Sequence, residues 1–127
     1  MNILRFIFIS LIGLPSANAL DLSNSQTLLA TCTVEDNGYI GFKAAETEIE
    51  KVFARGRYER ALMSCVSYIQ GVSNATSYLG NASFCLPSVS LEDLRSVVVI
   101  TLKQKYQTEE NSIPLILDSL TRNWPCE

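Results

Sequence analysis

The chain has 127 residues, of which ten are Lys or Arg, thirteen are Asp or Glu and none is His. A formal net charge of −3 without a Lys/Arg-rich stripe argues against nucleic-acid binding. The absence of His removes the usual general base of Ser/His and Cys/His catalysts and the commonest metal ligand. The composition therefore favours a binding protein that is not an enzyme and holds no metal and no cofactor.

Residues 1–19 have the pattern of a cleaved export signal. Arg5 supplies positive charge, an apolar run covers residues 3–14, and Ala17-Asn18-Ala19 suits cleavage after Ala19. The apolar run is shorter than the roughly 20 residues that a transmembrane helix needs. Cleavage would leave residues 20–127, which is enough for one small domain. We therefore expect a single exported domain without a membrane anchor.

Helical periodicity predicts an all-α fold, a small bundle of four to five helices stapled by disulfides. Ser25 is expected to cap a short first helix that ends near Cys32. A second helix is expected over residues 42–54, with Arg55 and Gly56 as its end signals. The inward face expected for this second helix consists of Ala45, Ile49, Val52 and Phe53.

The next expected helix covers residues 58–79. Apolar residues recur along it at intervals of three and four, which predicts one continuous buried stripe. The stripe consists of Ala61, Leu62, Cys65, Tyr68, Ile69, Val72, Ala75 and Leu79. Gly71 lies in it at a cost of about 1 kcal/mol in helix propensity, which suggests a close helix crossing. Gly80-Asn81 is expected to end the helix.

Two further helices are expected. Ser90 has the pattern of a cap for the first, which continues through Tyr106. The β-prone run at residues 97–100 would also suit a buried strand, but the cap and the spacing favour a helix. After a polar loop, Ser112 is expected to cap the last helix. The expected inward residues are Leu91, Leu94, Val98, Thr101 and Leu102 in one helix and Ile113, Ile116, Leu117, Leu120 and Trp124 in the other.

The four cysteines are expected to form two structural disulfides, because exported proteins fold in an oxidising compartment. The last two helices should run antiparallel, since a short loop joins them, and this would bring Cys85 close to Cys126. Cys32 would then pair with Cys65. Four cysteines allow three pairings, and the sequence leaves all three open.

Three segments together resemble a known family. They are Cys65-Val66-Ser67-Tyr68-Ile69-Gln70-Gly71-Val72, the turn Phe84-Cys85-Leu86-Pro87 with the following Val89-Ser90, and the closing Trp124-Pro125-Cys126. Their order and spacing behind an export signal resemble the Tai/Rap family of type VI secretion amidase immunity proteins, over about residues 22–127. The long charged stretch at residues 33–57 departs from that family's compact pattern.

The resemblance implies a small, mostly helical periplasmic protein of Gram-negative bacteria. Its partner would be a peptidoglycan amidase delivered by sister cells, whose catalytic cleft it would block, and some such proteins act as homodimers. The candidate toxin-binding residues are Glu92, Asp93, Arg95, Gln107, Glu109, Glu110 and Asn111. The alternative explanation for these residues is that they are solvated charges and a helix cap.

A second function fits the same composition. A periplasmic acid-stress chaperone of the HdeA type is also small, helical, exported and disulfide-linked. Such a chaperone opens at low pH, but here two disulfides would restrain the opening. Without His, carboxylates would be the only acid sensors.

Overall fold

The computed structural model describes residues 21–33 and 46–127. The predicted export signal, its cleavage site at Ala19 and the first residues of the helix expected from residue 42 lie outside these ranges. The described residues form four helices, with isolated bridges and no strand. They are α1 (Ser25–Cys32), α3 (Glu48–Tyr78), α4 (Leu91–Lys105) and α5 (Ser112–Asn123). The predicted all-α fold is confirmed.

Helix α3 is the longest element and corrects a predicted boundary. It runs unbroken for 31 residues, about 46 Å at 1.5 Å per residue, and passes through the expected end at Arg55 and Gly56. Arg55 Nε donates a hydrogen bond of 3.1 Å to Glu59 across the expected break. A glycine inside a helix costs only about 1 kcal/mol. The capping box formed by Thr47 and Glu50 begins the helix well before this point.

The N-caps of the shorter helices differ from the sequence prediction by one residue. Asn24 and Asn111, rather than Ser25 and Ser112, cap α1 and α5, each accepting a backbone N–H at 3.0 Å. Ser90 caps α4 as predicted, accepting the N–H of the first turn at 3.1 Å. Asn and Ser are about equally good caps, so propensity could not choose between neighbours. Ser25 and Ser112 are buried instead, and their hydroxyls donate hydrogen bonds to carbonyls of distant segments.

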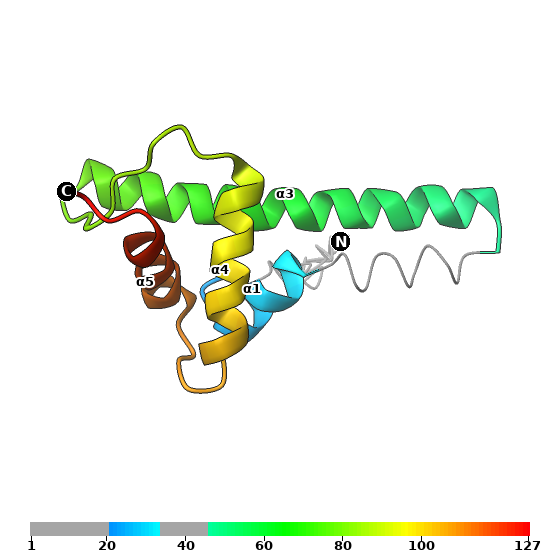
Figure 1. The fold of residues 1–127 in the computed structure, drawn as a ribbon. Coiled ribbons are helices and arrows are strands. Elements are labelled where there is room, and N and C mark those ends of the chain that lie inside the picture. Colours follow the sequence, from blue (N-terminus) through cyan, green and yellow to red (C-terminus); the bar gives the residue numbers. More distant parts are fainter. Residues whose placement is uncertain (1–20, 34–45) are drawn as a thin grey trace, which may run out of the picture.

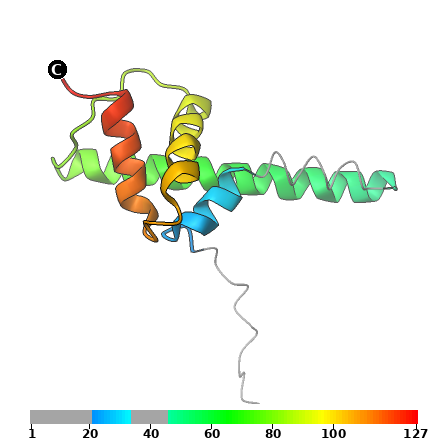
Figure 2. The same ribbon diagram turned by 60° about the horizontal axis from the view of Figure 1, so that its bottom comes forward.

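The hydrophobic core lies where α1, α4 and α5 pack against the C-terminal part of α3. In Figure 1, α4 crosses α3 with α5 beside it, and α1 lies close to the lower part of α4. The most deeply buried side chains are Leu28, Cys32, Cys65, Ile69, Val98, Leu102, Ile116 and Leu120. The N-terminal part of α3 extends beyond this bundle in both views (Figures 1 and 2).

Several residues expected in the core are exposed instead. Ile49 and Val52 are each 70% exposed and Phe53 is 61% exposed, because this part of α3 lies beyond the bundle. The other expected inward residues that are exposed are Ala75, Leu79, Leu91 and Ile113. Gly71 marks no helix crossing, since a Cβ built there meets nothing within 4 Å. Periodicity identifies the apolar face of a helix, but not where its packing partners end.

Two disulfides staple the bundle. Cys32–Cys65 joins α1 to α3 across a Cα–Cα distance of 5.1 Å. Cys85–Cys126 joins the segment before α4 to the residues after α5 across 4.8 Å. These are the pairings that the order of the helices favoured. The first disulfide is buried in the core, whereas both cysteines of the second are exposed.

Candidate functional site

The expected toxin-binding residues lie at opposite ends of α4. Glu92, Asp93 and Arg95 are among its first five residues, and we call them the helix-start cluster. Residues 107–111, the loop cluster, follow its last turn and connect it to α5. The length of α4 separates the two clusters by about 20 Å. The structure therefore does not bring the candidate residues together into one patch (Figure 1).

The helix-start cluster is largely used by the fold. Arg95 is only 7% exposed, and its Nη1 donates a hydrogen bond of 2.9 Å to the carbonyl of Cys32, the last residue of α1. Its guanidinium also pairs with the carboxylate of Glu92, and this hydrogen bond lowers the pKa of Glu92. Asp93 accepts a hydrogen bond of 2.7 Å from the Ser90 hydroxyl at the cap. Arg95 therefore links α1 to α4 inside the bundle, and little of its side chain is accessible to a partner.

The loop cluster is held firmly against the start of α1. The N–H of Ser25 donates to the carbonyl of Glu110 at 2.7 Å, and the N–H of Ser112 donates to the carbonyl of Ser23 at 2.7 Å. Asn24 and Asn111 form the bridge between the two segments. The buried Ser25 hydroxyl also donates to the carbonyl of Glu109. Backbone and side-chain hydrogen bonds thus hold this loop against the start of α1.

The side chains of the loop cluster divide into two groups. Glu109 and Asn111 serve the loop itself: the Glu109 carboxylate accepts the Asn111 N–H at 3.0 Å, and Asn111 caps α5. Gln107 and Glu110 are exposed beside a hollow of about 550 Å³. The hollow is lined by Asn24, Ser25, Gln26, Tyr106, Gln107, Thr108 and Glu110. These groups can donate and accept hydrogen bonds, so the surface is suited to polar recognition.

No local pattern in the sequence predicts the other half of this hollow. Asn24 and Gln26 come from the start of α1, more than eighty positions before the loop cluster. Their neighbour Ser25 was predicted only as the cap of α1. Hydrogen bonds between distant segments place them here, and no spacing rule reports such contacts.

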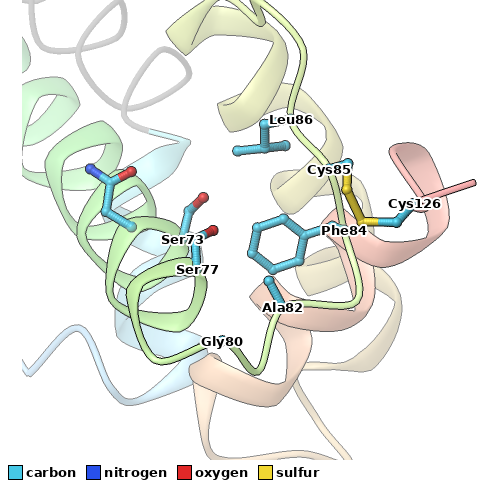
Figure 3. A pocket seen from close by; sticks show the side chains of 9 residues that line it. Ser73, Ser77, Gly80, Ala82, Phe84, Cys85, Leu86 and Cys126 are labelled. Carbon is cyan, nitrogen blue, oxygen red and sulfur yellow. A yellow bond between two sulfur atoms is a disulfide. The ribbon is translucent and has the colours of Figure 1, made fainter.

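A second hollow of about 500 Å³ lies at the C-terminal end of α3. Figure 3 shows Ser73 and Ser77 on α3 facing Phe84 and Leu86, with the exposed disulfide at the edge. The Ser73 hydroxyl is buried and has no hydrogen-bond partner within the described part of the chain. No Asp, Glu, Lys, Arg or Tyr lines this hollow, so its walls offer no general acid or base.

In residues 21–33 and 46–127, no three or more His, Cys, Asp or Glu side chains gather where they could hold a metal ion. None of the helices described there has both the length and the apolar character needed to cross a bilayer.

Comparison with known proteins gives the family. A family model described as Rap1a immunity proteins matches residues 24–126, well over half of the 127-residue chain. The chain belongs to the Rap1a immunity protein family. No curated protein and no solved structure matches it. The matched range of this Rap1a family member includes both disulfides, the three motif segments and the loop cluster.

Membership in the Rap1a family sets the broad role of the protein. The family consists of immunity proteins, which implies that this member has a cognate toxin as its partner and acts as a non-enzymatic inhibitor. The family likeness expected from the motif segments is thereby confirmed. The polar hollow beside the loop cluster is compatible with such a role, because binding through hydrogen bonds needs no reactive group.

Proposed function

We propose that this Rap1a family member binds a type VI secreted peptidoglycan amidase in the periplasm and occludes its catalytic cleft. Family membership supports the immunity role. The export-signal pattern at residues 1–19, with cleavage after Ala19, and the two disulfides support a periplasmic location. The homodimer that the family resemblance implies is an expectation that this proposal does not require.

The loop cluster is the surface that we propose enters or covers the cleft of the toxin. Binding through a flexible loop loses affinity because the loop must be ordered on association. Here the ordering is complete before the toxin arrives, since Ser25 and Ser112 hold the loop by backbone hydrogen bonds of 2.7 Å. These two backbone hydrogen bonds are the observation on which the proposed surface depends. Gln107 and Glu110 then project from a fixed backbone toward a partner.

Inhibition by this surface requires no chemistry from the immunity protein. An amidase with a Cys/His cleft needs an accessible thiolate and an open path for its peptide substrate. A rigid polar loop that fills the cleft blocks both. Glu92 and Asp93 are exposed and are proposed only as peripheral contacts, whereas the buried Arg95 is excluded from the interface.

The proposal is tested with a purified candidate amidase toxin and peptidoglycan as its substrate. Wild-type protein should inhibit at a one-to-one ratio at neutral pH. The double variant Gln107→Arg/Glu110→Arg should weaken inhibition at least tenfold, since both side chains would meet the toxin. Glu127→Lys is the matched control, because it also reverses an exposed carboxylate but lies beyond the opposite end of α5.

Two outcomes would count against the proposal. If the double variant inhibits as well as the wild type, the loop cluster is not the inhibitory surface. If the wild type fails to bind any amidase but suppresses aggregation of unrelated proteins after acidification, the acid-stress chaperone is the better explanation. Family membership favours the toxin partner over that second function.

A further inference from the structure

The toxin-binding proposal does not use the hollow at the C-terminal end of α3. This hollow lies between α3 and the segment that leads from α3 to α4. Figure 3 shows Ser73 and Ser77 on its helix side, with Phe84 and Leu86 on its segment side. Among the described residues that line it, none carries a charge. Such walls are suited to an uncharged ligand, because a charged group would lose water there without gaining a partner.

The helix side of the hollow carries polar groups that are available to a ligand. Ser73 is 1% exposed, and its hydroxyl has no hydrogen-bond partner in the part of the chain that the structure describes. Asn74 and Ser77 are exposed, and their side chains form no hydrogen bond with any other described residue. Buried hydroxyls in folded proteins usually have a partner, because leaving one unpaired destabilises the fold. The Ser73 hydroxyl therefore points to a ligand group that donates or accepts a hydrogen bond.

The segment side of the hollow is an extended piece of chain that is paired along one edge. Gly80, with a φ of +71°, turns the chain out of α3, and Phe84 then forms an antiparallel bridge with Pro125. The N–H of Cys85 donates to the carbonyl of Trp124 at 2.9 Å. Backbone groups of successive residues in an extended chain point to opposite edges. The N–H and the carbonyl of Phe84 therefore point away from Trp124.

The second edge of this segment is unpaired. Phe84 is 4% exposed, yet within the described ranges neither its N–H nor its carbonyl forms a hydrogen bond. The N–H of Leu86, which points to the same edge, is also unpaired there. An extended segment with free N–H and C=O groups is a template to which another extended chain can add. A sugar fits less well, because the buried Phe84 ring leaves too little surface for stacking on a sugar ring.

We propose that this hollow binds an uncharged, extended peptide segment of a partner protein, which adds as a strand to the free edge at Phe84. One residue of the peptide exchanges two backbone hydrogen bonds with Phe84, which supplies affinity. An apolar side chain of the peptide contacts Leu86, and a polar group bonds to the Ser73 hydroxyl, which together supply specificity. The loop cluster lies before α5 and Cys126 lies after it, so this site is separate from the proposed inhibitory surface. The inference does not depend on the proposed function.

Selection of random peptides displayed on phage against the oxidised, exported protein tests the site without any toxin. Enriched peptides should lack Asp, Glu, Lys and Arg at their central positions. Synthetic copies, added to isotope-labelled protein, should shift the amide signals of Phe84 and Leu86 in NMR spectra and give a dissociation constant from the titration.

Two serine variants separate binding from folding. Ser73→Ala removes the hydroxyl in the hollow and should weaken binding of the synthetic peptide at least tenfold. Ser119→Ala is the matched control, because the Ser119 hydroxyl is likewise buried without a partner among the described residues but does not line this hollow. It should leave the dissociation constant unchanged. Circular dichroism should show that both variants keep their helix content, since each loses only an unpaired group.

Methylation of the peptide backbone tests the strand pairing independently of Ser73. Methylating the peptide N–H that pairs with Phe84 should abolish binding, whereas methylating the next residue, whose N–H points away, should have little effect. The proposal is overturned if no peptide is enriched, if the enriched peptides are charged, if Ser73→Ala binds them as well as the wild type, or if the position of the methyl group does not matter. Binding of the uncharged sugar N,N′-diacetylchitobiose in the hollow, with no peptide bound, would also overturn it.

Discussion

Arg95→Met is the substitution that best separates a structural role from a binding role at the start of α4. Arg95 donates a hydrogen bond of 2.9 Å to the carbonyl of Cys32, which is the last residue of α1. A carbonyl at this position has no partner within its own helix. Methionine keeps most of the apolar stem but removes the donor and the positive charge. The Cys32 carbonyl would then be buried without its charged partner.

The cost follows from these contacts. An unsatisfied buried carbonyl costs about 1 to 3 kcal/mol. Loss of a positive charge at the C-terminal end of α1 adds roughly 0.3 to 1 kcal/mol. Glu92 adds little, because its side chain is 62% exposed and the pair is screened by solvent. We expect Arg95→Met to lower the free energy of unfolding by about 2 to 3 kcal/mol, and the melting temperature by roughly 10 °C or more.

Urea unfolding of the oxidised protein at pH 7, followed by circular dichroism, measures this loss. Glu92→Gln is the control: it removes the exposed charge, leaves the Arg95 bond to Cys32 in place, and should cost no more than about 1 kcal/mol. The reasoning fails if Arg95→Met is as stable as the wild type, or if Glu92→Gln destabilises it equally. Retention of toxin affinity by folded Arg95→Met would agree with its exclusion from the interface.

Three further predictions concern other parts of the bundle. Gly71→Ala should raise the free energy of unfolding by about 0.5 to 1 kcal/mol in thermal melts, because a Cβ there meets open space. The hydrogen bond from Lys105 (2.8 Å) lowers the pKa of Asp118 from its usual value of 3.8. The stability that ionised Asp118 contributes to the fold is therefore complete above pH 3.8 and is lost as pH falls through the lower folded pKa. Asp118→Asn should therefore cost about 1 kcal/mol at pH 7 but little at pH 2 in acid titrations of stability, and an equal loss at both pH values would contradict this. Under limiting reductant, alkylation and mass spectrometry should detect opening of the exposed Cys85–Cys126 before the buried Cys32–Cys65, and the reverse order would refute the burial argument.

The sequence was sufficient wherever local rules decide the outcome. The spacing of Cys65 and Ile69 placed them on the buried face of α3, and both are fully buried. The short loop between α4 and α5 made them antiparallel neighbours, which brings Cys85 and Cys126 together. Ser90 caps α4 as its surrounding residues suggested. Each of these follows from periodicity, loop length or cap chemistry within a short window.

The sequence could not predict which residues on the apolar face of a helix lie beyond its packing partners. Ile49, Val52 and Phe53 have the spacing of a core face, but the bundle stops before reaching them. Gly71 looked like a crossing point because it lies among apolar residues, yet no helix approaches its open side. Arg55 and Gly56 resembled a helix end, but the small propensity cost of the glycine did not interrupt α3.

In the candidate site, too, local features could be predicted from the sequence and long-range contacts could not. Sequence reasoning selected Glu110 and Gln107, which are exposed, but also Arg95, whose burial depends on its reach to the end of α1. The pairing of Asn24 with Asn111 depends on two segments at opposite ends of the chain. Long-range contacts of this kind are set by the assembled bundle, and a single sequence contains no local pattern for them.

The extension of α3 past its packing partners separates two kinds of evolutionary constraint within one helix. From Cys65 onward, inward-facing side chains are fixed by the residues they touch, and change there carries a folding penalty. Before Cys65, the exposed side chains of α3 can change without such a folding penalty. Substitutions of the exposed Ile49, Val52 and Phe53 would change this face while the stapled bundle stays intact. A lineage can thus diversify its outer contacts at little thermodynamic risk.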